Sequence, residues 1–167
     1  MHYARTFFIL ILLFCILETV RLWYISPPEM ASHFNAQGDP DCSFVPKLQF
    51  FIFQVKTALI VVGLGIVTQI LLVVVPIRMI NVPSREYWLS SEQRDATIDK
   101  LSSFVAVLFA AILLMTQATF ELAVSANLHT PIHFAAQLMV PVIVGFIIFT
   151  FLMLFWLVRS FRLPAGE

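Results

Sequence analysis

The sequence predicts an all-α integral membrane protein, a four-helix bundle, from its composition, its four long apolar segments and its distribution of basic residues. Of its 167 residues, 60% are hydrophobic and 12% are charged, and the mean hydropathy is +0.92. A typical soluble domain has about 25% charged residues. The chain therefore has more apolar surface than a soluble core of this size can bury, and we expect a bilayer to surround most of it.

Four apolar segments are each long enough to cross a bilayer. They lie at about 6–25, 48–77, 101–128 and 131–158, and roughly 20 helical residues span the hydrocarbon core. Helices are expected because backbone groups in lipid must hydrogen-bond within their own segment. The predictions are one domain, 1–167, with helices at about 6–25, 48–77, 91–128 and 131–160, an outer loop 26–47 and an interfacial loop 78–90.

Basic residues predict the orientation of this bundle. One set of flanking segments contains seven basic residues and the other contains only Lys47; the seven are Arg5, Arg78, Arg85, Arg94, Lys100, Arg159 and Arg162. Loops rich in Lys and Arg stay in the cytoplasm. We therefore expect both termini and the 78–90 loop to be cytoplasmic, and the 26–47 loop to face the outside.

Several residues predict where the helices begin and bend. Ser90 and Gln93 have the spacing of a capping box, so the third helix is expected to begin near Ser91. Pro131 suits the first turn of the fourth helix. Pro141 is expected to kink that helix.

The outer loop has the composition of an ordered cap. Pro28 can open a short helix over 29–34, and Gly38 can adopt a positive φ and reverse the chain. Asp39-Pro40-Asp41 is typical of a second turn. We expect structural hydrogen bonding in this loop, although its acidic residues, His33 and Cys42 leave a metal or small ligand as an alternative.

The sequence does not indicate an enzyme. The sequence has no nucleophile elbow, phosphate loop or zinc-protease motif, so we expect no catalytic residue, no metal and no cofactor. Its net charge of zero gives no reason to expect a nucleic-acid partner. Cys15 lies in a predicted helix and Cys42 in the outer loop, so we do not expect them to form a structural disulfide.

The outer loop also resembles a known family through a set of spaced residues: Pro28, His33, Phe34, Asn35, Gly38, Pro40, Asp41 and Lys47. This pattern is similar to that of a bacterial membrane family described by a domain of unknown function. The same module forms the N-terminal part of immunity membrane proteins that protect bacilli from the sporulation-delaying toxin. The resemblance covers the first two predicted helices and the loop between them, and it implies a multi-pass protein of the bacterial inner membrane.

Four charged residues lie within the apolar segments at a similar predicted depth: Glu18, Arg21, Lys56 and Glu121. A charge in hydrocarbon is costly and needs a partner, a water-filled cavity or a function. One interpretation is a charge-balanced structural network. The other is a ligand or ion site in the outer half of the bundle, to which Gln117 and His133 would also contribute.

The sequence supports three hypotheses about function. The first is a non-enzymatic accessory or immunity-like membrane protein whose outer loop and polar cluster contact a peptide, a small ligand or a membrane complex. The second is a small transporter or an ion- or proton-conducting protein that uses Glu121. The third is a structural subunit of a larger membrane complex.

Overall fold

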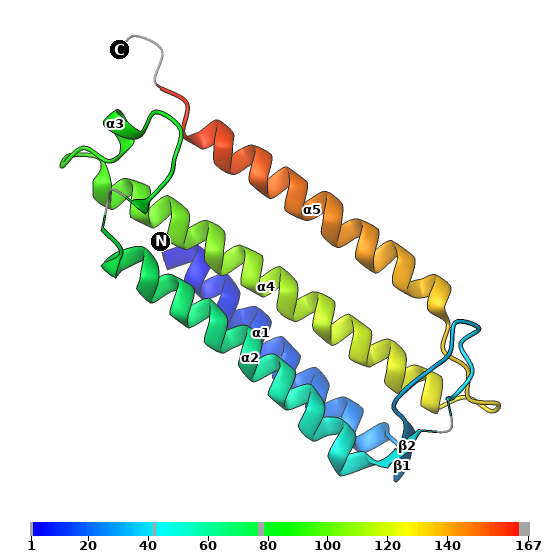
Figure 1. Cartoon of the computed structure of the whole chain (residues 1–167). Coiled ribbons are helices and arrows are strands. Elements are labelled where there is room, and N and C mark those ends of the chain that lie inside the picture. Colours follow the sequence, from blue (N-terminus) through cyan, green and yellow to red (C-terminus); the bar gives the residue numbers. More distant parts are fainter. Residues whose placement is uncertain (1, 42, 77–78, 164–167) are drawn as a thin grey trace.

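The computed structural model describes residues 2–41, 43–76 and 79–163, and this part of the chain is mostly helical (Figure 1). Four helices are long and apolar enough to cross a membrane, which confirms the predicted helical fold and indicates a multi-pass membrane protein. Their bounds are α1 (His2–Ile25), α2 (Lys47–Val74), α4 (Arg94–Asn127) and α5 (Met139–Ser160). Shorter elements are β1 (Glu29–Ala31), β2 (Phe44–Pro46), α3 (Arg85–Trp88) and the 3₁₀ helix η2 (Ala136–Leu138). Cys42 and the predicted end of the second helix at residue 77 lie outside the described residues.

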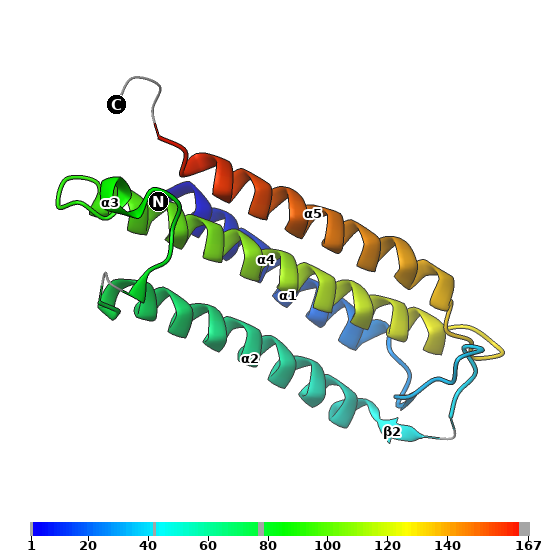
Figure 2. The same cartoon turned by 45° about the horizontal axis from the view of Figure 1, so that its top comes forward.

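Helix α4 is the centre of the arrangement. It packs against α1, α2 and α5, and Figures 1 and 2 show α2 and α5 on opposite sides of it. Successive long helices run in opposite directions, so the start of α1 and the end of α5 lie at the same end of the bundle. We name this the inner end, after the predicted orientation, and the end with β1 and β2 the outer end.

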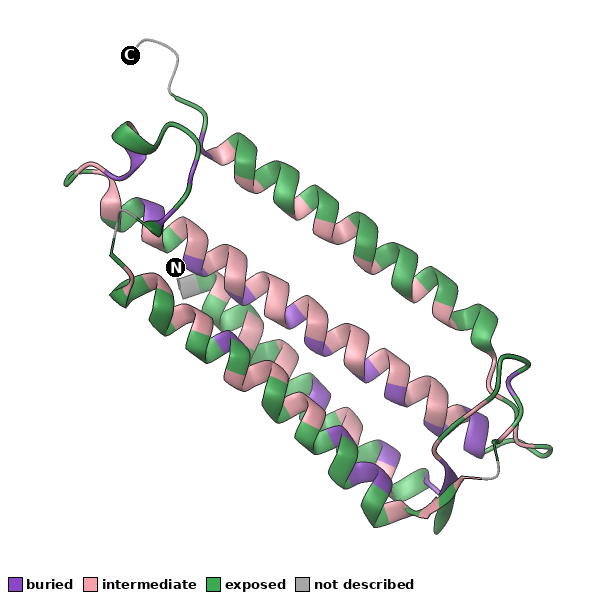
Figure 3. Ribbon diagram, viewed as in Figure 1, coloured by how far each residue is buried: buried purple, intermediate pink, exposed green. Residues whose placement is uncertain are grey.

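Burial is also greatest along α4 and least along α5 (Figure 3). No residue of α5 is buried. Small side chains let the helices approach α4 closely: a Cβ atom on Gly65 of α2 would lie 3.2 Å from the ring of Phe109. The buried residues of α4 are Thr97, Ser102, Ala106, Ala110, Leu113, Gln117, Phe120, Val124, Ala126 and Asn127.

The predicted start of the third helix was wrong. Helix α4 begins at Arg94 rather than near Ser91, and its N-cap residue, Gln93, makes no capping hydrogen bond through its side chain. The chain turns here instead, because the carbonyl of Ser90 accepts hydrogen bonds from the backbone N–H groups of Gln93 and Arg94. The residues with capping-box spacing therefore form a turn with backbone hydrogen bonds instead of a helix cap.

The predicted start of the fourth helix was also wrong. Residues 131–135 are not helical, and α5 begins only at Met139, after η2. Pro141 is therefore the third residue of α5, in the first turn, where a missing N–H has no helical partner to lose. Accordingly, α5 is continuous from Met139 to Ser160. The physical reason is tertiary: the N–H of Phe134 donates to the carbonyl of Gly38 in the outer loop.

The inner end joins α5 to α4 through α3. Trp88 donates from Nε1 to the carbonyl of Phe161 at 2.9 Å. Lys100 donates from Nζ to the carbonyl of Ser160 at 3.1 Å and lies 3.6 Å from the centroid of the Trp88 ring. A cation placed at the last carbonyls of a helix satisfies them and favours the helix dipole. Ile80, Val82 and Leu89 pack around this contact.

Replacing Lys100 with methionine tests this inner contact. Lys100→Met should destabilise the protein by about 1–2 kcal/mol, the sum of a lost helix-end charge and a lost cation–π contact. Thermal unfolding in detergent micelles measures the change. Arg162→Met is the matched control, because Arg162 is exposed at the same end and its side chain forms no ion pair or hydrogen bond within the described residues. Equal melting temperatures for the two variants would contradict the assigned role.

Candidate functional site

The outer loop is a hairpin, not the predicted short helix. Residues 29–31 form β1, which pairs antiparallel with β2, with Met30 opposite Val45. Met30 is fully buried and packs with Leu22 and Phe50. A short helix opened by Pro28 was the local preference, but strand pairing places Met30 in the core and satisfies the backbone of both strands.

The motif segment at the tip of this hairpin folds around Asn35. The side-chain Oδ1 of Asn35 accepts hydrogen bonds from the backbone N–H groups of Gln37 at 3.0 Å and Asp39 at 2.9 Å. The backbone N–H of Asp41 donates to the carbonyl of His33, and Phe34 forms a β-bridge with Pro40. The motif therefore forms a tight, self-bonded turn.

Gly38 docks this turn on the segment that precedes α5. Its φ is +91°, and a Cβ atom would lie 2.3 Å from the carbonyl oxygen of Phe134. The N–H of Phe134 donates to the Gly38 carbonyl at 2.7 Å. The rings of Phe34 and Phe134 lie 5.1 Å apart, and Nδ1 of His133 lies 3.3 Å from a carboxylate oxygen of Asp39. A glycine is required here for both the backbone conformation and the close approach.

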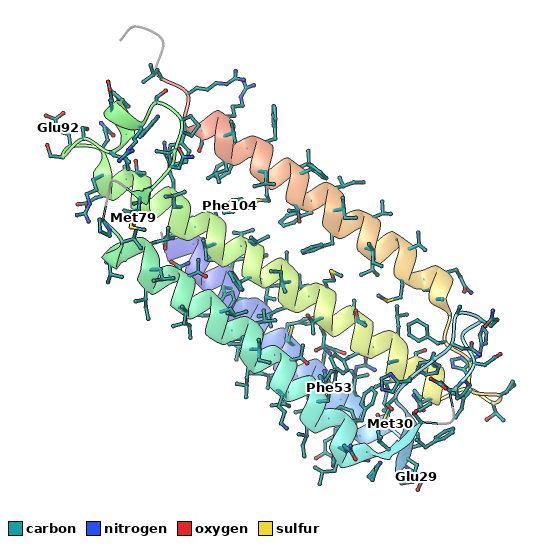
Figure 4. All side chains as sticks on the ribbon, in the orientation of Figure 1. Glu29, Met30, Phe53, Met79, Glu92 and Phe104 are labelled. Carbon is teal, nitrogen blue, oxygen red and sulfur yellow. The ribbon has the colours of Figure 1, made fainter. Side chains whose placement is uncertain are left out.

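Two further residues tie the hairpin to the helices. Lys47 donates from Nζ to the carbonyls of Trp23 at 3.1 Å and Ser26 at 3.3 Å, at the end of α1. Asn127, the last residue of α4, accepts from the N–H of Ala31 at 2.7 Å and donates to its carbonyl at 3.1 Å. Sequence reasoning included Lys47 and missed Asn127, which looked like an ordinary polar residue at the end of a helix. We refer to residues 26–46 with these contacts as the outer cap; Figure 4 shows Glu29 and Met30 within it.

Three of the four predicted charges meet beneath the outer cap. Arg21 donates from Nε to Glu18 at 2.7 Å and from Nη2 to Glu121 at 2.5 Å. Their side chains are 45%, 24% and 42% exposed, in the order Arg21, Glu18, Glu121. Two carboxylates face one guanidinium group, so the Glu18–Arg21–Glu121 triad has a formal net charge of −1. This charge lies in the outer half of the bundle.

Lys56 does not join this triad. It lies on α2 and is exposed, and no ion pair or hydrogen bond to its side chain occurs within residues 2–41, 43–76 and 79–163. Its depth matches the prediction, because Gln54, two residues away, contacts α1 and α4. Two residues along a helix amount to roughly 200° of rotation, so Lys56 points away from the others. The interpretation of a charge-balanced network that joins all four residues is therefore wrong, because Lys56 takes no part in it.

Gln117 belongs to a separate, uncharged cluster inside the bundle. Gln54 donates from Nε2 to Thr19 at 3.0 Å and to Oε1 of Gln117 at 3.2 Å. Gln54 is 2% exposed and Gln117 is 8% exposed. In the described structure, Oε1 of Gln54 and Nε2 of Gln117 have no hydrogen-bond partner. Gln54 was not predicted, since a lone amide in an apolar segment gives little signal in a single sequence.

His133 likewise lies apart from the triad. It is exposed and contacts Asp39 of the outer cap. Across the described ranges, no three His, Cys, Asp or Glu side chains come close enough to hold a metal ion. The site therefore consists of a firmly held cap, which carries Glu29, Asp39 and Asp41, above a partly exposed ion triad.

Comparison of the chain with protein-family models, with curated proteins and with solved structures finds no match.

Substitution of Gly38 tests the docking of the outer cap. Gly38→Ala should lower the free energy of unfolding by about 2 kcal/mol or more, because alanine is strained at this φ and its Cβ meets Phe134. Thermal unfolding and limited proteolysis within 26–46 measure the effect. Gly63→Ala, where a Cβ meets nothing within 4 Å, is the control and should not be destabilised. An undiminished melting temperature for Gly38→Ala would mean that the cap is not held at this point.

Proposed function

We propose that this chain is a non-enzymatic membrane protein, accessory or immunity-like, that binds a cationic peptide or small cationic ligand at its outer end. The excess negative charge of the Glu18–Arg21–Glu121 triad is the observation that carries this proposal. A positively charged group that reaches the outer half of the bilayer would be attracted to these two partly exposed carboxylates.

The form of the triad supports binding over a purely structural role. A structural ion pair needs one carboxylate, and Glu18 already supplies it within α1, three residues from Arg21. Glu121 adds a second carboxylate from α4. An anion that lacks its own cation is costly near hydrocarbon, and a cationic ligand would offset that cost.

The outer cap supports the same proposal. It is held by Lys47 at the end of α1, by Asn127 at the end of α4 and by Gly38 against Phe134. A surface fixed at three points loses little conformational entropy when a ligand binds. The exposed residues of its tip, with His33 and Asp39 among them, would supply polar contacts beside the triad.

The resemblance of the outer-loop motif supports the family and location. We propose that the chain belongs to the bacterial inner-membrane family that shares this motif, with both termini in the cytoplasm. In the structure the motif residues have structural tasks: Asn35 bonds the turn, Gly38 docks it and Lys47 caps α1. A motif of this kind specifies the cap, while the triad would specify the ligand.

Conduction of ions or protons has less support. Between Ser102 and Gln117, the buried residues of α4 are Ala106, Ala110 and Leu113. This apolar stretch is about 22 Å long at 1.5 Å per residue. A transport path would need polar groups or water at this depth.

A binding measurement tests the proposal. The probe is a fluorescent, 20-residue amphipathic peptide of leucine and lysine, added to phosphatidylcholine vesicles that contain the protein. Glu121→Gln should weaken protein-dependent binding about tenfold, as expected for loss of about 1.4 kcal/mol. Glutamine still accepts a hydrogen bond from Arg21, so folding should be retained.

Glu92→Gln is the matched control, because Glu92 is an exposed carboxylate at the opposite end of the protein (Figure 4). It should bind the peptide like the original protein. A Glu121→Gln protein that binds normally but melts at a lower temperature would show that the triad is structural. Equal binding by protein-free vesicles would refute the proposed function.

A second candidate function is supported by α5. This helix has no buried residue, and its exposed side chains include Ile147, Phe151 and Phe155. A structural subunit would cover such a face with a helix of another protein. Phe151→Ala with Phe155→Ala should then abolish co-purification of the partner from native membranes after mild solubilisation. Leu59→Ala with Ile66→Ala on α2 is the control, and recovery of the original chain only as a monomer would exclude this function.

A further inference from the structure

A second candidate site lies at the inner end of the bundle, away from the triad. A groove of about 700 Å³ runs between α1, α2 and α4. Its walls are mostly apolar and include Phe8 of α1, Ile70 of α2 and Phe109 of α4. Cavities that hold small ligands have this size and this character: apolar walls with a few polar groups.

Small residues line part of the groove: Gly65 and Ala106 both border it and are both buried. Gly65 brings α2 close to the ring of Phe109. The space that remains between α1, α2 and α4 forms the groove. The groove is partly open rather than an enclosed cavity, as expected for a site that a lipid chain enters from the bilayer.

Two opposite charges stand at the polar end of the groove. Arg5 of α1 and Asp99 of α4 both line it and are exposed. Within the described residues, neither side chain forms an ion pair or a hydrogen bond, with the other or with any third residue. The other polar residues of the groove, Gln69 and Ser102, are already bonded to each other.

The two charges differ in depth. Thr19 and Gln117 lie at one level because both contact the same side chain of α2. From that level, Ser102 is 15 residues down α4 and Arg5 is 14 residues down α1, so the two lie at nearly equal depth. Asp99 is three residues beyond Ser102, which places it about 4.5 Å farther toward the inner surface.

We propose that the groove binds one phospholipid with a zwitterionic headgroup, of the phosphatidylethanolamine class. An acyl chain lies along the apolar walls, the phosphate pairs with Arg5 and the ammonium group pairs with Asp99. The positions of Arg5 and Asp99 match such a lipid. Its phosphate lies nearer the acyl chains, at the depth of Arg5, and its ammonium group extends farther toward the inner surface, where Asp99 lies. A purely anionic lipid would satisfy Arg5 but would bring no cation to Asp99.

Native mass spectrometry of the full chain tests this assignment. The protein is exchanged into micelles that contain equal amounts of phosphatidylethanolamine and phosphatidylglycerol, and the retained lipids are identified. The original protein should retain phosphatidylethanolamine about two- to fivefold over phosphatidylglycerol, the ratio that an exposed ion pair provides. Arg5→Gln should retain less of both lipids, and Asp99→Asn should retain lipid without the preference.

Arg162→Gln and Glu86→Gln are the matched controls, since both residues are exposed and lie outside the groove. Both should behave like the original protein. Retention of the two lipids in the supplied ratio, or enrichment of phosphatidylglycerol, would overturn the assignment. So would Arg5→Gln and Asp99→Asn proteins that lose thermal stability without any change in lipid ratio, because Arg5 and Asp99 would then pair with each other. The triad is unchanged in every variant, so these results do not depend on the proposed function.

Discussion

The structure depends on how backbone groups at the ends of its helices are satisfied near a bilayer. The last carbonyls of a helix have no partner within it, and the cost of leaving them unpaired rises where water is scarce. Lys47 satisfies those at the end of α1, and Lys100 satisfies one at the end of α5, each with its ammonium group close to a tryptophan ring. Asn127 does the same for a strand of the outer cap. These contacts fix both ends of the bundle.

Helix α4 connects these ends, because it contacts each of the other long helices. Its first turns hold the inner contact through Lys100, and its last residue, Asn127, holds the outer cap. Glu121 lies between them and faces Arg21 of α1. The candidate ion triad is therefore positioned by the same helix that fixes both ends, and a ligand bound there would meet a preorganised surface.

The candidate site was predictable to the extent that spacing within one helix determined it. Glu18 and Arg21 are three residues apart, a spacing that places them on one face of a helix, and they form an ion pair. The pairing of Arg21 with Glu121 joins two helices and needed their packing. Lys56 shows the limit clearly: depth along α2 can be counted from the sequence, but the direction of its side chain depends on which face of α2 packs.

The sequence was sufficient to predict the helical class, the number of candidate membrane spans and an ordered loop. These features follow from composition, from the length of the apolar segments and from the positions of proline and glycine. They depend only on local propensity and on the thickness of a bilayer. Tertiary structure alone decided the details that compete with local preference. Residues 29–31 became a strand because Met30 enters the core beside Phe50. Residues 131–135 left the fourth helix because Phe134 bonds to Gly38. Both outcomes come from contacts between segments far apart in the chain, whose energy exceeds the small local preference for helix.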